Sequence, residues 1–247
     1  MRTALVTDLH ANRQAVQAVL DHAAAQGVDG HAFLGDFVGY GADPAWVVDR
    51  VREHVARGAI AVQGNHDAAV ARGALPTMRP DARRVVEWTR EQLEGAQLDF
   101  LAGLPLQQTL GDMLFVHANA YDPPAWDYIQ GRAEAVRSMH ATTARVTFCG
   151  HMHEPRLYHL SVVGKAGEFE PVAGKAIPLL GSRRWLAIPG STGQPRDGNP
   201  AACYAIYDDD LAELTFWRVP YDVEAAGSRI LHAGLPAALA ARLLDGR

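Results

Sequence analysis

Apolar positions in the first quarter of the chain follow two periods in alternation. Residues 2–7 form a short apolar and β-branched run, and residues 15–23 then place apolar side chains at helical spacing, which predicts a strand that leads into a helix. The same order returns before residue 63, and such alternation predicts a largely parallel sheet with helices on its faces. The further elements predicted here are strands over 31–34 and 59–62 and a helix over 46–55 that follows Asp43-Pro44.

The rest of the chain carries a different mixture of patterns. Helical spacing over 79–104 predicts a helical hairpin, and short apolar pieces split by glycine and proline over 158–188 predict antiparallel strands and turns. No internal repeat or linker divides the sequence, so we expect residues 1–247 to form one domain with two sheets. The other predicted elements are strands over 113–116 and 146–149, a helix over 132–140, a hairpin of strands over 202–207 and 213–219, and two helices within 223–244.

The composition is that of a globular protein, with 48% hydrophobic residues, 21% charged residues and a formal net charge of -5. This balance gives no general attraction to nucleic acid or to anionic membranes, although a local basic patch stays open. No apolar run is long enough to span a bilayer, and we expect no membrane association. Only Cys149 and Cys203 are present, without a CxxC pair, so we expect a cytoplasmic protein that does not depend on disulfides. The sequence does not indicate the oligomeric state.

Most of the unusual polar residues lie in five short segments, each of which follows a predicted strand. The carboxyl ends of parallel strands share one edge of a sheet, so these segments can converge on one crevice. The polar side chains that would meet there are those of Asp8, His10, Asp36, Asn65, His117, His151 and His153. Two carboxylates, one amide and four imidazoles suit two divalent transition metals such as Mn, Fe, Zn, Ni or Co, whereas an oxygen-only cage would favour Mg or Ca. The segments are Asp8-Leu9-His10, Gly35 to Gly41, Gly64-Asn65-His66-Asp67, Val116-His117 and Gly150-His151-Met152-His153.

Each of these residues alone also has an ordinary structural interpretation. Asp8 falls where a helix-capping residue is often found, and a lone histidine after an apolar strand, such as His117, is more often a core residue. His151 and His153 are two residues apart on an extended segment, so their side chains would face the same side, as a metal pair requires. The set as a whole therefore favours metal binding.

The order of the five segments resembles the calcineurin-like metallophosphoesterase family, whose pattern runs D-x-H, G-D, G-N-H-D/E, H and G-H-x-H. Residues 189–198 (PGSTGQPRDG) and 221–224 (YDVE) also resemble its small bacterial branch, related to diadenosine tetraphosphatases and Ser/Thr phosphatases. The resemblance implies a four-layer α/β/β/α sandwich with two mixed sheets. We also expect the hairpins over about 156–188 to form a lid region over the pocket. These hairpins carry Lys165, Lys175, Arg183 and Arg184, although a solvated face is the usual meaning of such charges.

The resemblance also implies a set of metal ligands and a mechanism. A hydroxide bridging the two divalent metals, with Mn the first candidate and Fe, Ni, Co or Zn as alternatives, would attack phosphorus in line. His66 would bind a phosphoryl oxygen or protonate the leaving alkoxide, and Asp67 would orient or polarise His66. Gly64 and Gly150 each precede a ligand at a point where a side chain would crowd the metals. The implied ligands are Asp8, His10 and His153 for the first metal, Asn65, His117 and His151 for the second, and Asp36 as the bridge.

Three further residues are candidates for contact with the substrate. Asn12 has helix capping as its main interpretation and a substrate contact as the alternative. Tyr40 either lines the pocket or packs its own loop. Arg196 lies in a loop framed by glycine and proline, where it either grips a substrate phosphate or forms a salt bridge with Asp197 or Asp222.

The predicted function is that of a hydrolase, a metal-dependent phosphodiesterase or phosphatase acting on small phosphoesters, with nucleotides the first candidates. A metal-dependent nuclease acting on DNA or RNA stays open, and its activity should fall steeply with salt if a basic track follows the backbone. A non-catalytic scaffold of the same fold is the other alternative. All seven ligand positions and His66 are present, which favours catalysis over the scaffold.

Overall fold

Strand β1 (Arg2–Val6) divides the core of the protein into two parts. The computed structural model describes residues 1–74 and 78–247. The Ala4 and Val6 side chains of β1 pack in one buried cluster with helix α1 (Arg13–Ala25), whereas Leu5 belongs to a cluster on the opposite face. The two faces differ because successive side chains of a strand alternate. Tyr204 and Ala205 on the neighbouring β11 (Ala202–Asp208) divide in the same way.

Both sheets have six strands and mix parallel with antiparallel pairs. The first has the order β3-β2-β1-β11-β12-β9, with β1, β2 and β3 parallel, and the second has the order β4-β5-β6-β10-β7-β8, with β5, β6 and β10 parallel. The prediction of a largely parallel sheet thus holds for half of each sheet. The remaining strands are β2 (Gly30–Phe33), β3 (Ile60–Ala61), β4 (Gln107–Leu110), β5 (Met113–Val116), β6 (Val146–Phe148), β7 (Arg156–Ser161), β8 (Ala166–Phe169), β9 (Ala176–Pro178), β10 (Arg183–Ile188) and β12 (Glu213–Val219).

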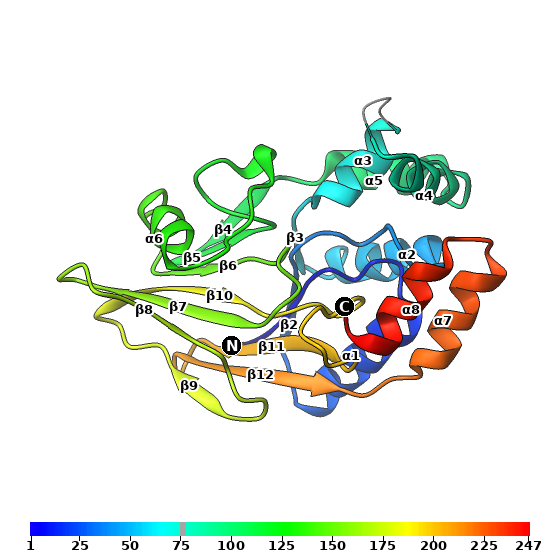
Figure 1. The fold of residues 1–247 in the computed structure, drawn as a ribbon. Coiled ribbons are helices and arrows are strands. Elements are labelled where there is room, and N and C mark those ends of the chain that lie inside the picture. Colours follow the sequence, from blue (N-terminus) through cyan, green and yellow to red (C-terminus); the bar gives the residue numbers. More distant parts are fainter. Residues whose placement is uncertain (75–77) are drawn as a thin grey trace.

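The sheets pack face to face, and helices cover their outer faces, so the four-layer α/β/β/α prediction is confirmed (Figure 1). α1 and α2 pack on the first sheet, and α6 packs on the second. The further helices α3 to α5 and α7 to α8 gather at one end of the molecule (Figure 1). The helices are α2 (Pro44–Val55), α3 (Asn65–Arg72), α4 (Pro80–Glu91), α5 (Gly95–Gly103), α6 (Arg132–His140), α7 (Val223–His232) and α8 (Ala237–Asp245), with a short 3-10 helix at Pro123–Ala125.

Two local predictions need correction. The helical stretch over 79–104 does divide into α4 and α5, but both contact α3, a helix that the sequence pattern did not indicate. Strand β4 was also missed, because all four of its residues are exposed and three of them are polar, so no apolar alternation marks it.

Residues 156–188 form sheet rather than a cover over the pocket. β7, β8 and β10 belong to the second sheet and β9 to the first, and the β7–β8 hairpin lies at the end opposite to α7 and α8 (Figure 1). The Arg184 guanidinium donates to the carbonyls of Met139 and Thr142, so it fastens β10 to the end of α6. Within the described residues, no helix combines the length and the apolar character that crossing a bilayer would require.

Candidate metal centre and active site

The parallel strands of both sheets end at one site. Asp8 follows β1, Asp36 follows β2 and Asn65 follows β3, while His117 and His151 follow β5 and β6 of the second sheet. The loop that carries Asp8 and His10 runs beside the loop that carries Asp36, since the His10 N–H donates to the Asp36 carbonyl over 2.9 Å. The site therefore lies where loops from the two sheets meet, as the order of the motifs predicts.

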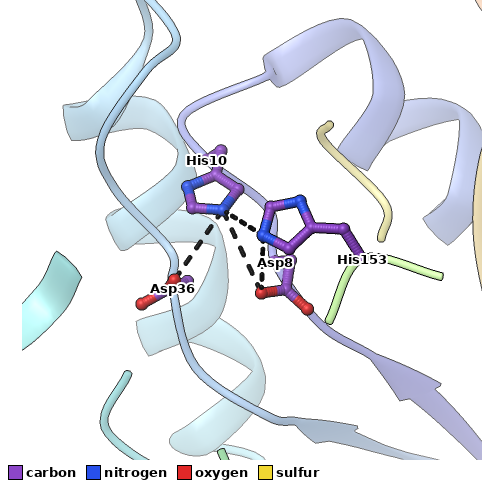
Figure 2. A group of neighbouring side chains, drawn as sticks. All are labelled: Asp8, His10, Asp36 and His153. Carbon is purple, nitrogen blue, oxygen red and sulfur yellow. Dashed lines mark hydrogen bonds and ion pairs between the residues drawn. The ribbon is translucent and has the colours of Figure 1, made fainter. Parts of the chain in front are cut away.

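Four of the predicted ligands form a first group (Figure 2). His153 Nε2 lies 3.2 Å from Asp8 Oδ1 and 3.2 Å from His10 Nε2, and His10 Nε2 lies 3.7 Å from Asp36 Oδ2. All four side chains are buried. Their donor atoms face one another across a space that a single cation would fill.

Asp36 also belongs to a second group, together with His117 and His151. His117 Nε2 lies 3.4 Å from Asp36 Oδ2 and 3.2 Å from His151 Nδ1. The Asn65 carboxamide oxygen is 3.2 Å from the same His117 nitrogen. The structure thus brings all seven predicted ligands together, and the Asp36 carboxylate lies between the two groups.

Backbone carbonyls fix which nitrogen each histidine presents. The Nδ1–H groups of His10, His117 and His153 donate to the carbonyls of Val38, Leu34 and Gln194, and the Nε2–H of His151 donates to the Trp126 carbonyl. In the neutral form of each ring, the other nitrogen carries a lone pair that points into the centre. Carbonyls that hold a ligating imidazole in one tautomer are a common feature of metal sites, so the donor set fits two divalent cations.

The electrostatics of the site also favour a cation. Burial alone would raise the pKa values of Asp8 and Asp36, but facing imidazoles, His153 for Asp8 and His117 for Asp36, hold both low. Burial disfavours the charged form of His117, yet Asp36 and Asp8 raise its pKa to about 9. The two buried carboxylates therefore attract positive charge, which a divalent cation supplies.

The backbone around the centre is strained and tightly packed. Five of the candidate ligands have left-handed φ angles, between 46° and 69°, which residues other than glycine rarely adopt. A Cβ atom at Gly64 would come within 2.2 Å of the Asp36 backbone nitrogen, so glycine is required there. At Gly150 a Cβ atom would lie 1.9 Å from Thr7 Oγ1, which agrees with the prediction that side chains would crowd these points. The strained candidate ligands are Asp8, His10, Asp36, His151 and His153.

His66 lies at the start of α3, beside both groups. Its ring Nε2 is 3.1 Å from the Tyr40 hydroxyl, its backbone N–H donates to Asp36 Oδ1, and its ring meets the His10 ring edge to face. Burial lowers the pKa of His66, which leaves the imidazole neutral near pH 7. A neutral imidazole beside the centre, outside the ligand set, is able to exchange a proton with a bound substrate.

The chain matches the model of the calcineurin-like phosphoesterase superfamily domain over residues 1–210. It belongs to this superfamily. The phosphoesterase is 33% identical, over 99% of its length and 98% of that of its relative, to the uncharacterized protein MJ0912 of Methanocaldococcus jannaschii. Membership of this family indicates an enzyme that hydrolyses phosphoric esters.

Two solved structures place the fold of the phosphoesterase. A metallophosphoesterase from Sphaerobacter thermophilus is 36% identical and superposes with a TM-score of 0.88 over 100% of both chains. A candidate diadenosine tetraphosphatase has a TM-score of 0.52 at 16% identity, over 87% of this chain and 93% of the other, which shows a shared fold.

Asp67 of the phosphoesterase differs from the expected role beside His66. Its carboxylate accepts from the N–H groups of Asp36, Phe37 and Gly64 over 2.8 to 3.0 Å, so it joins the loop after β2 to the first turn of α3. The His66 ring pairs with Tyr40 instead. Burial and the charge of Asp36 raise the pKa of Asp67 to about 7. Asp67 therefore positions the loop of Asp36 and the start of α3 rather than the imidazole.

Asp67→Asn is expected to destabilise the phosphoesterase and to weaken metal binding. The amide NH2 of asparagine faces backbone N–H groups that need an acceptor, which costs about 2–3 kcal/mol. Urea unfolding measures this cost, and metal titration should show an affinity lower by about 10- to 100-fold. Glu224→Gln, in the exposed first turn of α7, is the matched control and should unfold as the wild type does. An Asp67→Asn variant as stable as this control would contradict the assignment.

The substrate candidates Asn12 and Arg196 have defined partners. Asn12 caps α1 with its Oδ1, as its main interpretation predicts, and its amide N–H groups donate to the Gly193 carbonyl and the Tyr221 hydroxyl. Arg196 lies over the Tyr40 ring and donates to Gln194. The two acids considered as partners of Arg196 are engaged elsewhere: Asp197 pairs with Arg218, and Asp222 caps α7.

Sequence reasoning missed four residues that support the centre. Ser191 Oγ donates to the Asp8 carbonyl and accepts the Gln194 N–H, so the loop after β10 holds both a ligand loop and the carbonyl that orients His153. Trp126 provides the carbonyl for His151, and the Tyr128 ring stacks on His151 with centroids 4.1 Å apart. The signals available were the resemblance of 189–198 to the family and two aromatic residues in a loop rich in proline.

Proposed function

We propose that the protein is a dinuclear-metal phosphoesterase that hydrolyses phosphodiester or phosphomonoester bonds of small molecules, with nucleotides as the first candidates. The observation that carries the proposal is the Asp36 carboxylate, which belongs to two convergent groups of buried ligands at once. A shared carboxylate is the feature that a pair of metals requires and that a single structural ion does not.

The first metal would be held by Asp8, His10, Asp36 and His153, and the second by Asp36, Asn65, His117 and His151. Mn is the first candidate, with Fe, Ni, Co and Zn as alternatives, because imidazole combined with carboxylate and amide oxygen suits all of them. Such a pair, when bound, lowers the pKa of water for attack on phosphorus and offsets charge on the phosphoryl oxygens.

His66 would supply the proton chemistry. Its ring lies beside both ligand groups without being a member of either, and the Tyr40 hydroxyl holds the ring at Nε2. In this position the neutral ring donates a hydrogen bond to a phosphoryl oxygen, and the ring in its protonated form donates a proton to the leaving oxygen. Tyr40 lines the approach, and the Arg196 guanidinium over the Tyr40 ring adds positive charge there.

The nucleotide preference rests on the similarity to diadenosine tetraphosphatases. The candidate diadenosine tetraphosphatase shares the fold, and the segment 189–198 resembles the branch related to such enzymes. We place the protein in the cytoplasm, which agrees with free, buried thiols at Cys149 and Cys203.

Metal dependence tests the proposal directly. We expect chelator-treated protein to lose hydrolysis of bis-p-nitrophenyl phosphate and p-nitrophenyl phosphate, and to regain it with Mn, Ni, Co or Zn supplied separately, but less with Mg. The ratio of the two rates decides between diesterase and phosphatase. If no metal restored hydrolysis of either compound, the proposed enzymatic function would be wrong, and a binding scaffold of the same fold would become the better proposal.

A further inference from the structure

A cavity of about 660 Å³ opens beside His66 and Asn65 and extends away from the metal centre. Helices α3, α4 and α8 form its walls, and Tyr40 and Trp126 lie at its inner end. The cavity therefore begins where a scissile phosphoryl group would be held and has room for a further part of the substrate.

Three arginines line this cavity: Arg72 at the end of α3, Arg79 before α4 and Arg242 on α8. All three are exposed, Asp81 is the one acidic residue among the lining residues, and the described part of the chain shows no ion pair for any of the three. Other arginines nearby are used as braces: Arg90 donates to the carbonyls of Val70 and Ala71 in α3. The lining arginines are thus free to bind an anion.

The walls between the metal centre and the arginines are apolar and fixed. Val85 and Val86 of α4 and Leu239 of α8 are among the lining residues. α4 is held against the turn between α7 and α8 by Arg84, which donates to the Gly234 carbonyl over 2.8 Å. Val85 and Leu239 belong to one buried cluster, so α8 keeps its place against α4.

We propose that Arg72, Arg79 and Arg242 form a remote anion subsite that binds a second phosphate of the substrate while the metal centre holds the phosphate that is cleaved. The inference rests on the proposed function and narrows its substrate to an elongated small molecule with at least two phosphates. The rest of the substrate, a nucleobase or a sugar, lies against the α4–α8 wall. Arginine forks bind phosphate in bidentate fashion, and an apolar wall with a few convergent charges is typical of small-molecule sites.

A small molecule fits the cavity better than a nucleic acid does. A volume of about 660 Å³ is within the usual range for a single ligand, and three helices provide the walls of the cavity. The chain has a formal net charge of -5, which opposes binding of a long polyanion.

Binding of inorganic tripolyphosphate to metal-free protein tests the subsite without using catalysis. We expect calorimetry to show binding that Arg79→Gln and Arg242→Gln each weaken by about 10-fold, because each removes one arginine–phosphate contact. Arg83→Gln is the matched control, since Arg83 lies on α4 but pairs with Glu87 outside the cavity. Equal affinity in the two subsite variants and the control would overturn the proposal.

The source of the second phosphate is decided by three competitors for tripolyphosphate. Tighter binding of adenosine 5'-triphosphate than of fructose 1,6-bisphosphate would assign the apolar wall to a nucleobase, and the reverse order would assign it to a sugar phosphate. Both results support the subsite. A twelve-residue oligonucleotide that binds more tightly than either, with a steep dependence on salt, would overturn it in favour of a nucleic-acid track.

Kinetics separate this inference from the proposed function. Diadenosine tetraphosphate serves as a substrate with several phosphates, and bis-p-nitrophenyl phosphate as one without a second anion. For hydrolysis of diadenosine tetraphosphate, the Arg79→Gln, Arg242→Gln double variant should have a KM about 100-fold higher than the wild type. Its loss in kcat/KM on this substrate should be at least 10-fold larger than its loss on bis-p-nitrophenyl phosphate. Equal losses on both compounds would contradict the subsite alone. Absence of hydrolysis by the metal-loaded wild type would contradict the proposed function, while tripolyphosphate binding would still decide the subsite.

Discussion

Asp36→Ala is expected to lose bound metal and turnover together. The Asp36 carboxylate is the one group shared by both sets of ligands, so its removal takes a donor from each metal at once. Ligand loss of this kind should lower kcat by about 10³-fold or more, because the charge that stabilises the phosphoryl oxygens is lost with the metals. Metal per chain, measured by mass spectrometry after gel filtration, and hydrolysis of bis-p-nitrophenyl phosphate check both parts.

Asp36→Asn separates the charge from the local structure. Asparagine keeps an oxygen that accepts the His66 N–H, a contact of 2.9 Å in the wild type, but removes the negative charge between the two sites. The amide variant should therefore fold as the wild type does and still lose the second metal. A variant that kept both metals and full turnover would show that Asp36 is not the bridge.

His66→Ala is expected to lower kcat by about 10²- to 10⁴-fold while metal content is unchanged. The ring contacts Tyr40 and His10 but belongs to neither ligand group, so its removal takes away proton transfer and leaves every metal donor in place. The loss of kcat should be small when the leaving group is p-nitrophenolate, which departs without being protonated. It should be large when the leaving group is an alkoxide, which needs a proton.

Tyr40→Phe is the matched control for this prediction. It removes the hydroxyl that holds the His66 ring at Nε2 and keeps the ring that packs on His10 and His66. Its effect on kcat should be smaller than that of His66→Ala and should show the same dependence on the leaving group. If His66→Ala retained the full rate on substrates with poor leaving groups, the proton-transfer role would be wrong.

The convergence of the candidate ligands was predictable because the segments that carry them follow apolar runs. Asp8, Asp36 and His117 all come within three residues of a buried strand, and the ends of parallel strands meet at one edge whatever the rest of the chain does. The four layers came from the family resemblance, since periodicity alone indicates alternating strands and helices.

The remaining features depend on which helices pack together, and no local pattern records that. The cavity exists because α4 meets α8. Val85 of α4 and Leu239 of α8 pack in one cluster, although they are more than 150 positions apart in the sequence. The Asp67 contacts were missed for a related reason: its partners are backbone N–H groups of the loop after β2, and every residue except proline carries such a group. Side-chain identity therefore gives no sign of where that carboxylate binds.

The left-handed backbone at the ligands has a consequence for the engineering of this protein. Of the nine non-glycine residues with positive φ in residues 1–74 and 78–247, eight lie in the loops around the centre, and each carries a conformational cost of about 1–2 kcal/mol. Glycine would relieve that cost at Asp8, His10 or His153, but only by deleting a metal donor. Selection for heat resistance alone would thus favour inactive chains, and a thermostable catalyst has to be obtained from the helices and sheet faces remote from the site.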